Sequence, residues 1–398
     1  MSFDNFNFSL DILAGVRAQG YTTPTPIQRQ GIPSIMSGRD VIGLAQTGTG
    51  KTAAFVLPTL QRLLDGPRGR VRALVMSPTR ELAEQTCEAV CQLGKRTGLR
   101  SVAIYGGVNM DQQSLILRNG IDIVVACPGR LLDHVWRGSI DLSDVEVLVI
   151  DEADRMFDMG FLPDIRNILR CLMKPRQTLL FSATMSPEIR RLVEDILHDP
   201  ISIQVDNQAP VASVSHALFP VKQHLKTPLL MELLYQIETD SVLVFTRTKI
   251  RAERLAQEIK AAGFRATSLQ GNLSQPRRQA ALDGFRTGSI KILVATDIAA
   301  RGIDISSISH VINYDMPDGL EAYTHRIGRT GRVDQLGDAF TLVTAADALM
   351  VRDIERALNT KLELRTLPGF DYSAPAPERD RVRIQVRPPV RRQVFARR

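Results

Sequence analysis

Short apolar runs rich in β-branched residues alternate along the chain with longer amphipathic segments. The apolar runs of the first half, which predict strands, are Val41–Ala45, Ala73–Ser77, Ser101–Tyr105, Ile121–Ala126, Val145–Ile150 and Thr178–Ser182. Most are apolar at nearly every position, as expected of strands that are covered on both faces. Between them, helices are predicted at Thr52–Leu64, Glu81–Gly94 and Leu131–Arg137. This alternation predicts a parallel sheet with crossover helices.

The same alternation returns in the second half of the chain. Strands are predicted there at Ser241–Thr246, Ala266–Leu269, Lys291–Thr296, His310–Tyr314 and Ala339–Val343. Helices are predicted at Thr248–Ala262, Gln275–Phe285 and Leu320–Ile327. We therefore expect one α/β domain at 1–206, a polar linker at 207–214, a second α/β domain at 215–368 and an Arg- and Pro-rich tail at 369–398.

Composition excludes several classes of protein. With 398 residues, 44% apolar and 23% charged, each half can bury an ordinary core, which argues against wholesale disorder. No run approaches the ~18 apolar residues of a membrane helix, and the N-terminus lacks a secretory pattern, which favours a cytoplasmic protein. We expect the four cysteines to be reduced thiols. Cys87 and Cys91 could share a helix face, but no second pair or histidine completes a zinc site.

A glycine-rich segment follows the first predicted strand and opens the next predicted helix. It reads Ala45-Gln46-Thr47-Gly48-Thr49-Gly50-Lys51-Thr52, and it fits the phosphate-binding P-loop except that Ala45 replaces the first glycine. Gly48 and Gly50 would let backbone N–H groups curl around phosphate oxygens, Lys51 would neutralise them, and the Thr52 hydroxyl could ligate Mg²⁺. An ordinary strand-to-helix turn is the alternative interpretation of this segment alone.

An acidic cluster comes about a hundred residues later, at the end of the buried-strand run 145–150. It consists of Asp151-Glu152-Ala153-Asp154. Carboxylates at the C-terminal edge of a parallel sheet lie where α/β sheets bind ligands. Asp151 could hold Mg²⁺, and Glu152 could orient or deprotonate an attacking water. A helix-capping cluster is the plainer alternative, but the pairing with a P-loop favours ATP hydrolysis.

A third segment, 325–332, is dense in fixed positive charge. Arg329 and Arg332 lie three residues apart at a predicted helix end and could point together at a transferring phosphate. Arginines that stabilise charge on the γ-phosphoryl oxygens are typically worth about 10³–10⁵ in rate. Because the P-loop lies in one half and these arginines in the other, we expect hydrolysis to require both halves.

Together these segments resemble the DEAD-box ATP-dependent RNA helicases, over about residues 3–365. The resemblance implies two tandem RecA-like domains, each a mainly parallel sheet with helices on both faces. Pro24-Thr25-Pro26-Ile27-Gln28 is similar to the family's Q motif, which implies that Gln28 reads adenine and that Phe3, or alternatively Phe6, stacks on it. The matches to the remaining motifs imply three further roles. Arg329 and Arg332 would be arginine fingers, Asp304 would contact the ribose, and interdomain coupling would involve Asp154, Ser182, Ala183, Thr184, His325 and Arg326.

The RNA contacts follow from further motif matches. Those in the first half are Pro78, Thr79, Arg80, Gly106, Gly107, Pro128, Gly129 and Arg130. Those in the second half are Arg247, Gln270, Gly271, Thr296 and Asp297. Turns and helix starts with Thr or Arg suit phosphate contacts, which do not read sequence. Two positions depart from the family: Cys127 stands where Thr is usual, and Gln270 where His is commoner.

The net charge of +7 is concentrated near the C-terminus, because 371–398 holds eight Arg and three acidic residues and so carries +5. This tail could tether RNA without sequence preference, or it could only aid solubility. The compact N-terminus and short basic tail are most like the bacterial RhlE-like subgroup, which implies work on ribosome assembly or RNA decay. A DNA-directed translocase and an ATP-gated RNA clamp remain as alternative functions.

Overall fold

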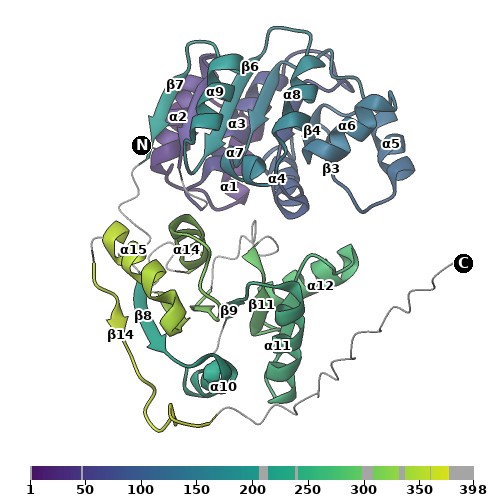
Figure 1. The fold of residues 1–398 in the computed structure, drawn as a ribbon. Coiled ribbons are helices and arrows are strands. Elements are labelled where there is room, and N and C mark those ends of the chain that lie inside the picture. The colour runs from purple at the N-terminus through teal and green to yellow at the C-terminus, as the bar shows by residue number, and fades with distance from the viewer. Residues whose placement is uncertain are drawn as a thin grey trace, which may run out of the picture.

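The computed structural model describes residues 2–45, 48–205, 214–237, 241–297, 308–330, 337–358 and 360–375. Over these residues the chain forms two α/β domains in tandem, drawn at the top and bottom of Figure 1. Each domain is built on a seven-stranded sheet whose neighbouring strands all run parallel. The two RecA-like domains and their parallel sheets confirm the predicted fold class.

The first sheet has the strand order β3-β4-β2-β5-β6-β1-β7. Its strands are β1 (Val41–Leu44), β2 (Ala73–Met76), β3 (Ser101–Ile104), β4 (Ile123–Ala126), β5 (Val147–Ile150), β6 (Gln177–Ser182) and β7 (Ile201–Gln204). Alternate residues of β2 pack into different cores: Ala73 and Val75 face one apolar cluster, and Leu74 and Met76 face the other. The sheet is therefore covered on both faces, which explains why its strands are apolar throughout.

Helices cover both faces of the first sheet (Figure 1). They are α1 (Leu10–Ala18), α2 (Pro26–Met36), α3 (Lys51–Leu63), α4 (Arg80–Leu93), α5 (Met110–Arg118), α6 (Pro128–Trp136), α7 (Ala153–Asp158), α8 (Leu162–Arg170) and α9 (Pro187–Ile196). A short 3₁₀ turn, Phe3–Phe6, precedes α1. Several of the helices begin directly after a strand, so their first turns meet at the C-terminal edge of the sheet.

The second sheet has the order β10-β11-β9-β12-β13-β8-β14. Its strands are β8 (Val214–Pro220), β9 (Val242–Phe245), β10 (Ala266–Leu269), β11 (Ile292–Ala295), β12 (His310–Asn313), β13 (Gly337–Val343) and β14 (Glu363–Leu364). Its helices are α10 (Lys226–Gln236), α11 (Lys249–Ala261), α12 (Gln275–Arg286), α14 (Leu320–Ile327) and α15 (Ala348–Leu358). When the strands are numbered within each domain, both sheets have the order 3-4-2-5-6-1-7, so the two domains share one topology.

Every predicted strand and helix corresponds to an observed one, but some elements were not predicted. Strand β7 was missed because it alternates apolar and polar residues and lies at the sheet edge. Strand β8 was missed as well, and its first residue, Val214, falls inside the predicted linker. Within the predicted tail, Phe370, Tyr372 and Ala374 pack against the second core. Among the helices that the structure describes, none is long and apolar enough to cross a membrane.

Candidate functional site

The glycine-rich segment forms a turn between β1 and α3. Gly48 and Gly50 have φ angles of 83° and 90°, a left-handed conformation that favours glycine. Helix α3 begins at Lys51, whose side chain is only 6% exposed, and whose Nζ has no hydrogen-bond partner within the described part of the chain. A buried, unpaired ammonium is costly, so this position fits a bound anion. Gln46 and Thr47 lie outside the described residues, and Thr49 and Thr52 flank Gly50 and Lys51.

Gln28 lies on the first turn of α2 and docks onto this phosphate loop. Its Oε1 accepts a hydrogen bond from Thr25 N at 2.9 Å, and its Nε2 donates to Gly50 O at 3.0 Å. A Cβ at Gly50 would lie 2.5 Å from Gln28 Nε2, so the close approach requires glycine there. The structure thus joins the segment that was expected to read the base to the segment that was expected to hold the phosphates.

The two candidate stacking aromatics, Phe3 and Phe6, are both buried in the first domain. The Phe3 ring lies nearly parallel to that of Tyr21, with 6.2 Å between centroids, and meets Phe6 edge-on at 6.0 Å. Tyr21 is itself 41% exposed. The aromatic cluster therefore lies just ahead of α2, with Tyr21 as its solvent-facing member, and the stacking role of Phe3 stays a prediction.

The acidic cluster follows β5, on the same edge of the sheet as the phosphate loop. Burial raises the pKa of Asp151 to about 6, against the opposing effect of Lys51. Burial acts in the same direction on Glu152, but Arg155 and Lys51 outweigh it and hold the pKa of Glu152 below its ordinary value. Arg155 forms a buried ion pair with Glu152. Two adjacent buried carboxyls are thus given different proton affinities by their surroundings.

Glu152 also has an unusual backbone, with φ 53° and ψ 54°. This left-handed conformation costs energy for a residue with a side chain, and such strain tends to occur at functional sites. It directs the chain from the end of β5 straight into α7. The strained turn therefore sets where the Glu152 carboxylate lies relative to Lys51.

Asp154 connects the acidic cluster to the segment that follows β6. Its Oδ2 accepts hydrogen bonds from Ala183 N at 2.9 Å and from Thr184 N at 3.0 Å. Asp154 N donates to Ser182 Oγ at 3.2 Å. The Ser-Ala-Thr segment and the acidic cluster are therefore tied together by backbone and side-chain bonds, so a shift of one would move the other.

Arg329 brings charge from the second domain to the acidic cluster. It follows α14 and is buried, and its positive charge contributes to lowering the pKa of Glu152 across the domain boundary. Arg332 and Asp304, the other two second-domain residues expected at the nucleotide, lie outside the described residues. His325 lies in the last turn of α14.

Arg326, for which the resemblance implied interdomain coupling, makes its contacts inside the second domain. It bonds to both Asp297 carboxylate oxygens, at 2.6 and 2.7 Å, and its Nη1 donates to Asn313 Oδ1 and to Asp315 O. Its guanidinium also lies over the Phe245 ring. In this structure Arg326 therefore positions the strand ends that carry the expected RNA residues.

Two side chains of α12 reach the first domain directly, and neither was among the predicted site residues. Arg278 forms an ion pair with Glu81, and Gln275 Oε1 accepts a hydrogen bond from Arg80 at 3.3 Å. The only sequence signal was their place at the start of a helix just after the predicted RNA residues Gln270 and Gly271. These contacts join the start of α12 to the start of α4.

Two of the predicted RNA residues of the first domain, Arg80 and Arg130, lie beside the Gly106-Gly107 turn. A Cβ at Gly107 would lie 2.2 Å from Arg80 Nη1, and a Cβ at Gly106 would lie 3.6 Å from Arg80 Nη2 and 3.9 Å from Arg130 Nη2. Two guanidinium groups, from the first turns of α4 and α6, therefore pack against this turn. Two fixed positive charges at a glycine turn suit the phosphates of a nucleic-acid strand.

Gln113, on α5, forms hydrogen bonds that hold Arg130 beside the glycine turn. It was not among the predicted site residues. Its buried Oε1 accepts from Arg130 Nη1 at 2.8 Å and lies 3.2 Å from His134 Nε2, and its Nε2 donates to Tyr105 O at 3.2 Å. Gln113 therefore fixes Arg130 relative to the residue that begins the glycine turn.

The departure at Cys127 changes how α6 begins. Cys127 occupies the N-cap position and makes no side-chain cap, whereas Thr79 caps α4 with a bond from Leu82 N at 3.4 Å. Burial raises the pKa of Cys127 to about 12, so this thiol stays neutral. Pro128 and Gly129 lie in the first turn of α6, which begins three residues before the predicted start at Leu131.

The predicted RNA residues of the second domain lie at the C-terminal ends of β9, β10 and β11. Arg247 N donates to Asp315 Oδ2 at 2.9 Å, and Gln270 Oε1 accepts from Asn272 N at 2.6 Å. Gly271 is covered by Lys249, whose Cε would lie 3.1 Å from a Cβ at that position. Thr296 and Asp297 follow β11, so both domains present their candidate residues at the same kind of sheet edge.

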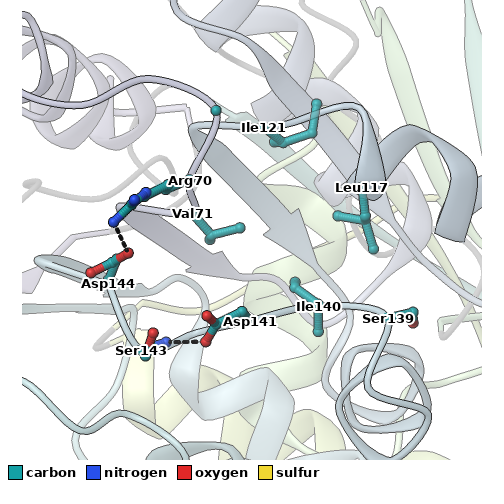
Figure 2. Close-up of a pocket in the computed structure, with 10 residues that line it drawn as sticks. Arg70, Val71, Leu117, Ile121, Ser139, Ile140, Asp141, Ser143 and Asp144 are labelled. Carbon is teal, nitrogen blue, oxygen red and sulfur yellow. Dashed lines mark hydrogen bonds and ion pairs between the residues drawn. The ribbon is translucent and has the colours of Figure 1, made fainter.

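A cavity of about 580 Å³ lies at the opposite edge of the first sheet, before β2, β4 and β5. Figure 2 shows its apolar side chains, Leu117, Ile121 and Ile140, and the ion pair between Arg70 and Asp144. None of the predicted site residues lines it. Its position separates it from the phosphate loop and from the glycine turn.

Comparison with known proteins agrees with this geometry. The DEAD/DEAH box helicase model matches residues 25–192, and the helicase conserved C-terminal domain model matches 225–334. The DEAD-box ATP-dependent RNA helicase CshA of Bacillus subtilis (strain 168) is 40% identical over 372 residues, which cover 93% of this chain and 75% of that protein. RhpA of Helicobacter pylori (strain B128), also a DEAD-box ATP-dependent RNA helicase, is 40% identical over 371 residues, with the same coverage.

Solved structures give the same result. S. cerevisiae Dbp5 bound to RNA and ADP BeF3 superposes with a TM-score of 0.84 at 31% identity, covering 92% of this chain and 95% of that one. A DEAD box protein from Methanococcus jannaschii gives a TM-score of 0.54 at 36% identity, covering 92% of this chain and 99% of that one. The chain belongs to the DEAD-box family of ATP-dependent RNA helicases.

Proposed function

We propose that this helicase hydrolyses ATP between its two domains and uses the cycle of closing and opening to bend single-stranded RNA and separate short duplexes. The observation that carries the proposal is that the two domains meet, through the Arg278–Glu81 ion pair, while buried Arg329 of the second domain contributes to lowering the pKa of Glu152 in the first. Lys51, Asp151 and Glu152 come from one domain and Arg329 from the other, so the full set of charges exists only when the domains are together.

The residues at the phosphate loop fit a nucleotide and a divalent cation. ATP with Mg²⁺ would supply the transferable phosphoryl group and the cation that activates it. The buried Lys51 ammonium has no hydrogen-bond partner among the residues that the structure describes, and an anionic phosphate would provide one. Thr52 and Asp151 would ligate the cation, and the raised pKa of Asp151, about 6, still leaves it mostly ionised at neutral pH.

Glu152 would orient or deprotonate the attacking water. Its lowered pKa keeps it ionised, as a group that receives a proton must be. The pair with Arg155 fixes the carboxylate in place. Arg329 would stabilise the charge that develops on the transferring phosphoryl group, and Arg332 and Asp304 would complete the second-domain side.

We propose that RNA lies along the strand ends of both domains. Arg80 and Arg130 flank the glycine turn in the first domain, and Arg247, Gln270 and Thr296 lie at strand ends in the second. The likeness to RNA-bound Dbp5 over both domains supports this path. Phosphate contacts of this kind do not read sequence, so we expect binding of many RNAs.

Two alternative functions predict different experimental results. An ATP-gated clamp would bind RNA tightly while hydrolysis stayed slow, and the cross-domain contacts of α12 would serve that role equally well. A DNA-directed translocase would be stimulated equally by single-stranded DNA and RNA. The intact set of Lys51, Glu152 and Arg329 favours an active hydrolase over the clamp. The Pro24–Gln28 block and the Asp151–Asp154 cluster argue against the DNA translocase.

The cellular setting rests on the sequence resemblance and on composition. We propose a cytoplasmic protein that acts in ribosome assembly or RNA decay, as implied by its likeness to the RhlE-like subgroup. The first-domain limit at residue 206 belongs to the same proposal, and the second domain takes in Val214 of β8 and the packed residues Phe370, Tyr372 and Ala374. Measuring RNA-stimulated ATP hydrolysis and short-duplex unwinding tests it, with Lys51→Ala and Glu152→Gln as inactive variants. Equal rates in all three proteins would contradict it.

A further inference from the structure

Two thiols and a hydroxyl meet on the outer side of the first domain. Cys87 and Cys91 lie one turn apart on α4 and face Ser101, the first residue of the edge strand β3. Cys87 Sγ donates to Ser101 Oγ at 3.6 Å, and Ser101 Oγ lies 3.2 Å from Cys91 Sγ. The hydroxyl can therefore accept from Cys87 while it donates its own hydrogen to Cys91.

Exposure separates Cys91 from the other cysteines. Of the four thiols, Cys91 alone is exposed, Cys127 is buried, and Cys87 and Cys171 are half-buried. Cys171 also uses its thiol to donate to Asn167 O. A reagent in solution thus reaches Cys91 first, while Cys87 stays beneath it as a hydrogen-bond donor.

The surroundings of this pair also favour a thiolate on Cys91. Once Cys91 loses its proton, Cys87 can turn its S–H from Ser101 to the Cys91 sulfur, and this bond lowers the pKa of Cys91 to about 6, with help from Ser101 and against the effects of burial and of Glu88. The pKa of Cys87 moves in the opposite direction, because it supplies the hydrogen of that bond. The thiolate is the nucleophilic form of cysteine.

We propose that Cys87, Cys91 and Ser101 form a site of reversible thiol modification, in which Cys91 is the reacting sulfur and small disulfides such as oxidised glutathione are the reagents. The Cys91 thiolate attacks one sulfur of the disulfide, forming a new S–S bond. The other half leaves as a thiolate, so atoms and electrons balance without another oxidant. Cys87 and Ser101 hold the attacking sulfur ionised.

The geometry argues against two other uses of the pair. Residues four apart on a helix have Cβ atoms about 5–6 Å apart, whereas a disulfide needs about 3.5–4.5 Å, so a bond between Cys87 and Cys91 would distort α4. A metal centre would need a third ligand, and no group of three candidate ligands occurs in the described ranges. An external partner for Cys91 requires neither change.

The test is alkylation by iodoacetamide, measured at each cysteine by peptide mass spectrometry on the full chain across pH 5 to 9. We expect the Cys91 rate to reach half its maximum below the ordinary cysteine value of about 8.5. At neutral pH, each unit by which the pKa of Cys91 lies below the ordinary cysteine value gives it up to about tenfold more thiolate than an ordinary cysteine has. Oxidised glutathione should then attach to Cys91 before any other cysteine.

Variants of the neighbours decide the assignment. Cys87→Ala and Ser101→Ala should each raise the pH at which Cys91 alkylation reaches half its maximal rate, toward the ordinary cysteine pKa. Cys87→Ser retains a hydrogen-bond donor and should leave this pH unchanged. Thermal midpoints and RNA-stimulated ATP hydrolysis of the variants check that the fold is kept. A wild-type midpoint at or above about 8.5, or one that Cys87→Ala leaves in place, would overturn the proposal.

Discussion

Arg278 of the second domain forms an ion pair with Glu81 of the first, and both side chains are largely buried, at 11% and 6% exposure. Glu81 lies in the first turn of α4, beside Arg80, which in turn contacts Gln275. The pair therefore links the closing of the domains to the place where the first domain is expected to hold RNA.

Breaking this pair should weaken domain closure. Arg278→Ala leaves the Glu81 charge without its partner, and truncating one member of a buried pair at an interface costs about 2–5 kcal/mol. We expect lower RNA-stimulated hydrolysis and a smaller closed fraction, read by fluorescence transfer between labelled domains. The exposed pair Arg254 and Glu258 supplies the control, because Arg254→Ala should cost less than about 1 kcal/mol. Equal effects of the two variants would show that the Arg278 contact does not stabilise closure.

Gln113 should act on RNA binding through Arg130. Gln113→Leu removes the acceptor shared by Arg130 and His134, so the guanidinium keeps only its bond to Val108 O and its ion pair with Asp133 and is held less firmly. We expect the RNA concentration that gives half-maximal ATPase to rise several-fold while the maximal rate stays close to that of the wild type. Gln112→Leu, an exposed neighbour on the same helix, is the matched control. A fall in the maximal rate with unchanged RNA dependence would rule out this role.

Stability of the first domain should depend on pH through His134. Burial, together with Arg130, holds the pKa of His134 below its ordinary value of 6.5, so the unfolded chain binds a proton at higher pH than the folded chain. The part of the stability that depends on neutral His134 is fully present above pH 6.5, and it is lost as the pH drops below that value. The thermal midpoint of wild type should fall more steeply from pH 7.5 to 5.5 than that of His134→Gln. The pKa of His310 in the second domain is lowered in the same direction, so pH-dependent unfolding of that domain should be unchanged in the variant. Identical slopes would contradict the assignment.

The basic C-terminal residues should contribute to RNA affinity without sequence preference. Residues 376–398 hold eight Arg and two acidic residues, and deleting them spares Phe370, Tyr372 and Ala374, which pack against the second core. We expect weaker RNA binding and a shallower dependence of affinity on salt, with unchanged basal hydrolysis. Fluorescence anisotropy at several salt concentrations measures both quantities. A salt dependence equal to that of the full chain would leave these residues only a solubilising role.

Sequence and structure agree best where a local pattern determines the result. Strand β5 is apolar at every position and therefore stands out, whereas β7 alternates and was missed. The glycines of the phosphate loop were predicted because a positive φ restricts the residue type. Gln113 and Arg278 could not be predicted, because each is defined by partners that only folding or domain closure brings near. The interdomain role expected of Arg326 stays a prediction, and the hydrogen bonds that the structure describes for it lie within its own domain.

The central claim is that Arg329 completes the ATP site from the second domain. Single-turnover hydrolysis at saturating RNA, with wild type and Arg329→Ala, measures this most directly. The account predicts that Arg329→Ala slows the step by about 10³-fold or more while ATP affinity changes little, since the arginine acts on charge that develops during the reaction. Arg352→Ala, an exposed arginine on α15, should match the wild type. Unchanged turnover by Arg329→Ala, accompanied by a large loss of ATP affinity, would contradict the account.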